Sequence, residues 1–355
     1  MKQIVTLILF SMLLLACKDN TKTQAKEDKA PKAKITEVAS IKGQQLTGVT
    51  VSNHRVFVNF PRWRKDIRYS VAEVGKNDKF KAYPNAQWNS WELGQPVTDS
   101  TFVCVQSVVA SNNLMYVIDT RNPLFQGVID QPVIFVFDLN TNQLVKSYKL
   151  PKEAYHEDSY INDIRIDNQS GYAYCTDSGN SGLVVLNLKT GEAKRVLDDH
   201  PSTSSEQSFL TIDGKTWNNS VHSDGIAFDA TTGILYYHAL TGYNLYAIPV
   251  DTLINGDQQN IEKSVQLVAK TAAPDGMIVH KGMLYYADLE QHKILQMDLK
   301  SKVVSTLLEG DSIKWADTFS VDDDHLYYTN SRIHEAAGDI SNLVFTVNKI
   351  LLIQH

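Results

Sequence analysis

The sequence predicts an all-β fold, a six-bladed β-propeller, on the basis of three observations. Helical periodicity is scarce from residue 35 onward, where short strands with alternating apolar and polar residues follow one another. One hairpin pattern recurs along this region at intervals of roughly 50 residues, which is typical of four-stranded propeller blades. Hydrophobic residues make up 43% of the chain, enough for a sizeable core. The length of 355 residues would allow two domains, but the repeat predicts one.

The amino end is predicted to be an export signal that lies outside this fold. Lys2 precedes an apolar run that is too short to span a bilayer. The run ends in Leu14-Leu15-Ala16-Cys17, which resembles the lipobox of bacterial lipoproteins, where the peptidase cuts before the lipid-bearing cysteine. We therefore expect a signal peptide over residues 1–16 and lipidation of Cys17. The alternative is an ordinary secretory signal with an incidental cysteine.

Residues 17–34 have no large apolar side chain and are expected to form a flexible tether. Lys18 follows the cysteine, and Asp19 does not occupy the position where Asp marks inner-membrane retention in some bacteria. By this resemblance the protein is exported and anchored to the outer membrane or cell surface, with the lipid on Cys17 as its membrane contact. Residues 35–355 then form the propeller, which we expect to be monomeric.

Six repeats can be aligned, each with a first strand, a tight turn and a second strand rich in Tyr, Val and Ile. In chain order they start at Thr47, Val105, Ile161, Ser223, Pro274 and Ala316. Two further strands follow several of them, as in GLVVLNL with EAKRVL. The last repeat is short of strands: LVFTVNKILLI supplies a third, and ITEVASI, just after the tether, is free to supply the fourth. This pairing of the two ends in one blade would close the ring and remove an open edge. A large β-sandwich with coincidental hairpins is the alternative.

Cysteine usage and charge narrow the possible functions. Cys104 and Cys175 lie in apolar runs, so we expect two buried free thiols, with a single bridge between them as the alternative. The formal net charge is −6, and the tether is rich in Lys, which leaves an acidic body. Because such a body repels phosphate backbones, nucleic-acid binding is not expected. Cationic ligands and metal ions suit its field better.

Polar residues are predicted to converge at one end of the central channel. The first strand of each blade lines the channel and starts at one face, and the second strand returns to that face. The expected ligand-binding residues are strand openers, one strand end and a nearby arginine: Gln106, Asn162, Asp224, Asp275, Asp317, Asn330 and Arg62. Asn162, Asp224 and Asp275 are the candidate metal ligands, for Ca²⁺ or another divalent cation. For any single Asp a turn or capping role is the alternative, and it is the favoured role for Asp119, Asp163 and Asp177.

The sequence contains no metal motif of fixed spacing, no Gly-rich phosphate loop and no GxSxG elbow, so no catalytic residue is assigned. Several blocks nevertheless resemble the Yellow/major royal jelly protein family, in the family's own order from about residue 44 to the end. They include GVTVSNHRVFVNFPRWR, VQSVVASNNLMYVIDTRNP, HSDGIAFDATTGILYYHALTG and WADTFSVDDDHLYYTNSRIH. The resemblance implies six blades. Insect members are secreted, and some are implicated in dopachrome conversion or bind biogenic amines at the channel mouth. This sequence differs from them in its lipid anchor and lacks their disulfide pattern.

A more distant resemblance is to gluconolactonase-like propellers, which hold one divalent cation at blade openings. Asn162 and Asp224 resemble two of those ligands, but Thr47-Gly48 stands where the first-blade acid is expected.

Two functions from different classes therefore remain. The first is a surface-anchored propeller that binds a small aromatic or cationic molecule, with a ring Asp as proton shuttle if it is a tautomerase. The second is a divalent-cation-dependent lactonase or esterase. A scaffold for partner proteins is a third option. The insert Lys65–Thr101, with Trp88 and Trp91, is expected to be a packed surface loop rather than a lid.

Overall fold

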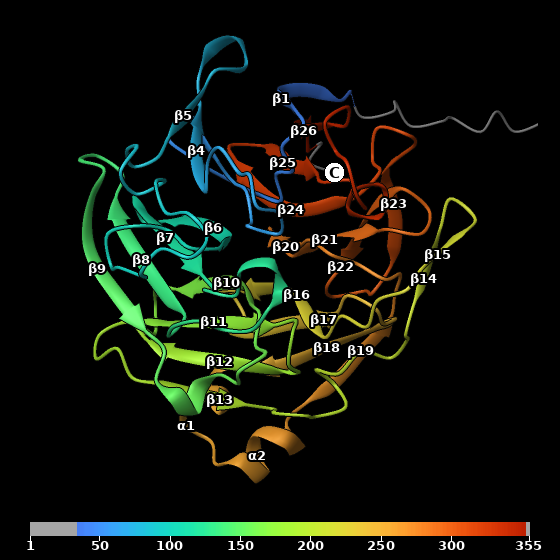
Figure 1. Ribbon diagram of the computed structural model, residues 1–355. Helices are drawn as coiled ribbons and strands as arrows, with labels where there is room; N and C mark the ends of the chain where they lie inside the picture. Colours follow the sequence, from blue (N-terminus) through green and yellow to red (C-terminus); the bar gives the residue numbers. More distant parts are fainter. Residues whose placement is uncertain (1–33, 353–355) are drawn as a thin grey trace, which may run out of the picture. The chain divides into compact units, whose positions relative to one another are not determined.

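The computed structural model describes residues 34–352, in which six four-stranded antiparallel sheets surround a central axis (Figure 1). Blade 1 is β2 (Gly48–Ser52), β3 (Arg55–Asn59), β4 (Val71–Val74) and β5 (Phe80–Ala82). Blade 2 is β6 (Val105–Ser111), β7 (Leu114–Asp119), β8 (Val133–Asp138) and β9 (Gln143–Lys149). Blade 3 is β10 (Ile161–Asp167), β11 (Tyr172–Asp177), β12 (Gly182–Asn187) and β13 (Ala193–Val196).

The second half of the ring repeats the plan. Blade 4 is β16 (Ser223–Asp229), β17 (Ile234–Ala239), β18 (Asn244–Pro249) and β19 (Gln266–Lys270). Blade 5 is β20 (Met277–His280), β21 (Met283–Asp288), β22 (Lys293–Asp298) and β23 (Val304–Glu309). Blade 6 is β24 (Ala316–Asp322), β25 (His325–Asn330), β26 (Val344–Leu351) and β1 (Thr36–Lys42). The prediction of an all-β, six-bladed propeller is confirmed.

The ring closes as the sequence predicted, by pairing of its two ends. β1 pairs antiparallel with β26, from Thr36 opposite Lys349 to Lys42 opposite Val344. Without β1, the edge of β26 would present unpaired backbone groups, which favour aggregation. The expected signal peptide, most of the tether and Cys17 lie outside the described residues.

Elements outside the blades are few. Two helices, α1 (Val250–Asn255) and α2 (Gln258–Lys263), join β18 to β19. A hairpin of β14 (Leu210–Ile212) and β15 (Lys215–Trp217) is inserted between blades 3 and 4. Within residues 34–352, no helix has the length and apolar character needed to cross a bilayer.

The core lies between neighbouring blades, where each sheet packs its apolar residues on the next. The insert after the first hairpin takes part in this packing. Trp88 contacts Phe102, Phe135 and Phe137, with ring centroids 5.0 Å apart in each pair. Trp91 is also buried. The insert is therefore packed, as predicted, but it is not a loop throughout, because Lys65–Thr101 also contains β4 and β5 of blade 1. Cys104 and Cys175 are buried free thiols, which also agrees with the prediction.

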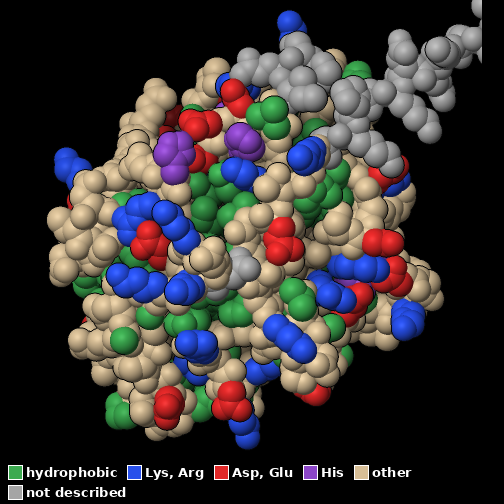
Figure 2. All heavy atoms as spheres, turned by 90° about the horizontal axis from the view of Figure 1, so that it is seen from above, with side chains coloured by type: hydrophobic (Ala, Val, Ile, Leu, Met, Phe, Trp, Pro, Cys, Tyr) green, Lys and Arg blue, Asp and Glu red, His purple; other side chains and the backbone are tan. Residues whose placement is uncertain are grey.

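The side of the ring in Figure 2 carries Lys and Arg side chains interspersed with Asp and Glu.

Candidate functional site

A cavity of about 630 Å³ opens where the first strands begin, and it collects most of the predicted site residues. Five residues from five consecutive blades line it, and all are buried: Gln106, Asn162, Asp224, Asp275 and Asp317. Blade 1 has Thr47 at the equivalent position and instead contributes Gln45, Trp63 and Arg64.

Glycines explain why the acidic residues come so close together. Gly225 and Gly276 directly follow Asp224 and Asp275. A Cβ at position 225 would lie 2.7 Å from the carbonyl oxygen of Asp275, and one at 276 would lie 2.4 Å from that of Asp317. Real Cβ contacts are never this short. The Asp-Gly pairs therefore let adjacent first strands approach at the channel, which places their carboxyls in one site.

A chain of hydrogen bonds links the openers across three blades. The hydroxyl of Tyr160 donates to Oε1 of Gln106 at 2.9 Å. Nε2 of Gln106 donates to Oδ1 of Asn162 at 3.1 Å, and Nδ2 of Asn162 donates to Oδ2 of Asp224 at 2.8 Å. Each amide thus accepts on one side and donates on the other. The chain ends with donors directed at the Asp224 carboxyl, which stabilises its charged form.

The three carboxyls have strongly altered acidity. Burial, followed by repulsion from Asp317, raises the pKa of Asp224 well above its usual value. Burial and repulsion from Asp224 do the same to Asp275, and burial and repulsion from Asp275 raise the pKa of Asp317. A hydrogen bond between the Asp224 and Asp275 side chains lowers the pKa of Asp224 and raises that of Asp275. The two carboxyls thus share a hydrogen bond between blades 4 and 5.

Aromatic side chains form the cavity walls. On one side Trp63 stacks on Phe125 with centroids 5.7 Å apart, and Phe125 lies 4.9 Å from Tyr160. Nε1 of Trp63 donates to the Tyr160 hydroxyl at 2.5 Å. Phe125 is 59% exposed, which is unusual for a large apolar side chain and leaves its ring available to a ligand.

The opposite wall is built from the inserted hairpin and blade 6. Trp217 meets Trp315 edge to face at 5.0 Å, and Trp315 stacks on His334 at 5.7 Å. Nε1 of Trp315 donates to Oδ2 of Asp275 at 2.5 Å. Burial lowers the pKa of His334, which favours its neutral form.

Arg64 is the single Arg or Lys among the described residues that line the cavity. Its Nη1 donates to Oε1 of Gln45 at 2.7 Å, and its Nη2 to the carbonyl of Ala336. Arg64 is therefore tied to the outer lining and makes no ion pair with the acidic residues among the described contacts. Within residues 34–352, the buried carboxyls Asp224, Asp275 and Asp317 therefore have no basic side-chain partner in the cavity.

Two predicted binding residues do not line the cavity. Arg62 is buried, and it donates from Nε to the carbonyl of Val103 and from Nη2 to that of Trp91. Asn330 accepts from the backbone N–H of Trp315 at 3.0 Å and donates to the carbonyl of Ser312. Both polar groups are satisfied by backbone partners. Asn330 holds Trp315 in place, and Arg62 fastens the packed insert.

Asp119 and Asp177 take the structural roles that were favoured for them. Asp119 accepts from the backbone N–H groups of Val103 and Cys104, both at 2.8 Å. Asp177 accepts from the N–H of Tyr160 at 2.8 Å and pairs with Arg195 at 2.9 Å. Each carboxylate ties the end of a second strand to the segment before the first.

The predicted metal ligands can be compared with this geometry. Asn162 directs its amide nitrogen at Asp224 and its oxygen at Gln106. Among the described residues, the three carboxyls do not form a group whose oxygens all lie within 4.8 Å of one another. A hard cation such as Ca²⁺ takes about 6–8 oxygen ligands. The amide orientation and the spread of the carboxyls fit a proton-sharing group better than this cation.

Sequence reasoning missed several lining residues, including Phe125 and Tyr160. Phe125 lies in a loop with a left-handed backbone, at φ 54°, and Leu124 before it has φ 59°. Tyr160 precedes β10 by one residue. Tyr160 lies two residues before the predicted opener Asn162, so its nearness in the sequence could have suggested it. The sequence around Phe125 contained no comparable signal for its left-handed conformation.

A family model described as major royal jelly protein matches residues 104–346, which is more than half of the chain. The chain belongs to this family. The match begins at the strand that opens blade 2 and ends in β26, so it includes all five openers that line the cavity.

Dopaminechrome tautomerase of Drosophila melanogaster is 22% identical over 278 residues, covering 70% of this chain and 58% of that protein. Protein yellow of Drosophila pseudoobscura pseudoobscura is 25% identical over 46% of this chain and 32% of its own. The chain thus spans less than two thirds of these relatives' lengths. Among solved structures, a luciferin-regenerating enzyme has a TM-score of 0.57 at 12% identity, covering 90% of this chain and 95% of that one. This last likeness shows the fold alone.

Proposed function

We propose that the cavity binds a small aromatic molecule carrying a cationic amine and tautomerises a compound of the dopaminechrome kind. The observation that carries the proposal is the hydrogen-bonded Asp224–Asp275 pair in the buried part of an aromatic-walled cavity. The relative named dopaminechrome tautomerase supports the choice of reaction.

Binding follows from charge and shape. Three buried carboxyls without a basic partner repel one another, and an ammonium would supply the missing positive charge. Trp63, Phe125 and Trp217 offer ring faces and edges on the two walls, and the fully buried Trp315 supports Trp217 from behind. Ring contacts of this kind are worth about 0.5–1.5 kcal/mol each beyond the area they bury.

A tautomerisation moves one proton and needs no oxidant or reductant. In the proposed step the Asp224 carboxylate takes a proton from a substrate carbon while Asp275 gives its proton to a substrate oxygen. One C–H bond breaks and one O–H bond forms. The pair then holds its proton on Asp224, and the hydrogen bond between the two carboxyls provides the path for its return to Asp275.

The test is an assay of the purified full chain with dopaminechrome in the presence of EDTA, together with calorimetric titration of aromatic amines. We expect turnover that EDTA does not affect and that Asp224→Asn and Asp275→Asn reduce by about 10²–10⁴-fold, the usual contribution of general acid–base catalysis. Asp323→Asn, at an exposed turn, is the matched control. Turnover that survives both substitutions would refute the proton-transfer roles, and amine binding without turnover would leave a binding protein.

The calcium-dependent lactonase or esterase remains the competing prediction, with Asn162, Asp224 and Asp275 as ligands. It predicts heat on titration with Ca²⁺ and hydrolysis that EDTA abolishes. The same titrations decide between the two functions.

We also propose that the chain is exported and anchored through a lipid on Cys17, on the strength of the Leu-Leu-Ala-Cys motif. Cys17→Ser should release the protein from the membrane fraction, while Cys104→Ser, at a buried thiol, should not. Unchanged pelleting of Cys17→Ser would rule out the anchor.

A further inference from the structure

A cluster of metal-binding side chains lies at the outer edge of the cavity, apart from the acidic openers. It consists of Asp213, His334 and Glu335, and we call it the rim cluster. One ligand atom from each lies within 4.8 Å of the other two. Asp213 lies in the turn of the β14–β15 hairpin, and the other two residues lie in the 3₁₀ turn Ile333–Glu335 of blade 6. The cluster thus joins an inserted hairpin to a blade.

His334 provides an independent indication that something binds here. Its side chain is only 7% exposed, yet within the described residues neither ring nitrogen makes a hydrogen bond. Nε2 faces the cluster, 3.4 Å from Oδ2 of Asp213 and 3.9 Å from Oε1 of Glu335. Buried polar groups in proteins nearly always have a partner. The His334 imidazole is directed between two carboxylates within ion-pair distance, yet its ring nitrogens make no hydrogen bond with either.

We propose that Asp213, His334 and Glu335 bind a divalent transition metal, with Zn²⁺ as the expected ion. Zinc takes imidazole nitrogen and carboxylate oxygen at about 2.0–2.2 Å, which separates tetrahedral ligand atoms by about 3.4 Å. The observed separations of 3.4 and 3.9 Å need only a small contraction to meet this requirement. The imidazole favours zinc over calcium or magnesium, which prefer oxygen ligands alone.

His292 holds the carboxylate of Asp213 in the orientation that the proposed metal site needs. Its Nε2 is 2.7 Å from Oδ1 of Asp213, the oxygen that does not face His334. Its ring lies 5.9 Å from that of His334. A hydrogen bond to the outer oxygen of a ligating carboxylate fixes its orientation and commonly accounts for a large part of metal affinity. His292 comes from blade 5, so three parts of the chain meet at this point.

Lys314 is the residue that a metal ion would displace. Its Nζ lies 3.5 Å from Oδ2 of Asp213 and 4.0 Å from Oε1 of Glu335, where its charge partly neutralises both carboxylates. Arg332 also pairs with Glu335. The Lys314 side chain is flexible and 23% exposed, so it can move into solvent when the ion binds. Removal of its charge should therefore strengthen metal binding.

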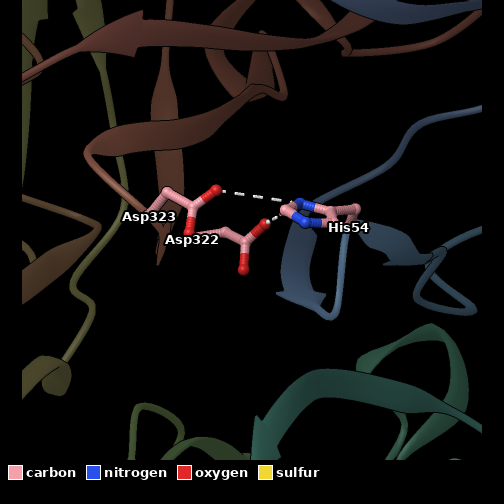
Figure 3. Close-up of side chains that lie close together, drawn as sticks. All are labelled: His54, Asp322 and Asp323. Carbon is pink, nitrogen blue, oxygen red and sulfur yellow. Dashed lines mark hydrogen bonds and ion pairs between the residues drawn. The ribbon is translucent and has the colours of Figure 1, made fainter.

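A second cluster offers a matched control. His54, Asp322 and Asp323 also lie close together, with Nδ1 of His54 3.1 Å from Asp322 and 3.9 Å from Asp323 (Figure 3). This His54 side chain is 78% exposed and makes a hydrogen bond with Asp322, so it has no unsatisfied buried group. We expect it to bind zinc far more weakly.

The test is calorimetric titration of Zn²⁺ into the full chain, repeated with Co²⁺ while its visible absorption is recorded. Because Trp315 stacks on His334, its fluorescence provides a further reading with Cu²⁺ as a quencher. We expect one tightly bound Zn²⁺, an affinity at least tenfold lower in Asp213→Asn and His334→Gln, and no change in His54→Gln. Lys314→Met should bind several-fold more tightly.

Glu335→Gln, at a more exposed position, replaces His334→Gln if circular dichroism shows that the latter is unfolded. No stoichiometric binding by the wild type, unchanged affinity in both ligand variants, or loss of binding in His54→Gln would overturn the proposal. An affinity that Lys314→Met leaves unchanged or weakens would do the same. Asp224→Asn should leave zinc binding intact, which separates this site from the carboxyls proposed for substrate.

Discussion

The indole Nε1 of Trp315 donates a 2.5 Å hydrogen bond to Oδ2 of Asp275 and so joins the aromatic wall of the cavity to its acidic residues. The same indole stacks on His334 and meets Trp217 edge to face. A single side chain therefore connects the carboxyl pair, the inserted hairpin and the rim cluster.

Loss of this donor should be measurable. Trp315→Phe keeps an aromatic ring but removes the N–H donor, which stabilises the charged form of Asp275 relative to the neutral form. Because the bond lowers the pKa of Asp275, we expect that pKa to rise further in the variant. Carboxyl-carbon NMR titration would measure the pKa. Trp217→Phe, which leaves the Trp315–Asp275 bond in place, should keep it unchanged, and an equal shift in both variants would contradict the assignment.

Neutralising a ring carboxyl should stabilise the protein near neutral pH. The pKa of Asp224 is raised above the ordinary aspartate value of 3.8, so its contribution to stability is complete below that value and is lost as pH rises through the folded-state pKa. Each unit of elevation corresponds to about 1.36 kcal/mol. Asp224→Asn should therefore raise the free energy of unfolding by more than about 1 kcal/mol at neutral pH, with a smaller gain in acid.

Denaturant titrations at several pH values would measure this effect, with Asp323→Asn as the control at an exposed site. A variant that is less stable than the wild type at neutral pH would mean that the Asp224 carboxylate has a cationic partner.

His238 should make the free energy of unfolding depend on pH in the opposite direction. It is fully buried, its Nε2 lies 2.8 Å from Oγ1 of Thr271, and burial lowers its pKa from 6.5 to about 4. The contribution of neutral His238 to the free energy of unfolding is present above pH 6.5 and is lost as pH falls to about 4. This loss amounts to about 3 kcal/mol. His238→Gln should remove this acid sensitivity in unfolding measurements, whereas the exposed His54→Gln should retain it. Equal acid sensitivity in His238→Gln and the wild type would show that another group is responsible.

The close approach of the first strands can be tested at Gly276. A Cβ there would lie 2.4 Å from the carbonyl oxygen of Asp317, so Gly276→Ala must push blades 5 and 6 apart. We expect a loss of about 1–3 kcal/mol in the free energy of unfolding, the usual cost of overpacking, and weaker amine binding. The control is Gly75→Ala, in the turn between β4 and β5 of blade 1, where a Cβ would lie 3.0 Å from the carbonyl oxygen of Lys79. This variant should leave amine binding unchanged. Normal binding by Gly276→Ala would show that this spacing does not shape the site.

The fold and the buried part of the cavity were predictable because both follow from the repeat. A residue such as Asp224 opens a first strand, and the ring geometry alone brings it to the channel beside Asp275. Asn330 was predicted at the channel as the end of a second strand and Arg62 by its nearness to one, but their side chains bond to backbone carbonyls and an N–H. The walls could not be predicted in this way. The position of Phe125 depends on a left-handed loop, and Asp213, which faces His334, comes from the hairpin inserted between blades 3 and 4.

The pairing of β1 with β26 has a consequence for how the protein matures. Translation makes the chain from its amino end, so β1 is the first of the described strands to appear and its partner β26, which ends at Leu351, is the last of them. Five blades can assemble from neighbouring segments as they appear, but the sixth needs both ends of the chain. Until β26 has been made, β1 is an unpaired strand that chaperones must protect. A premature stop codon before β26 would yield an open ring rather than a slightly shorter propeller.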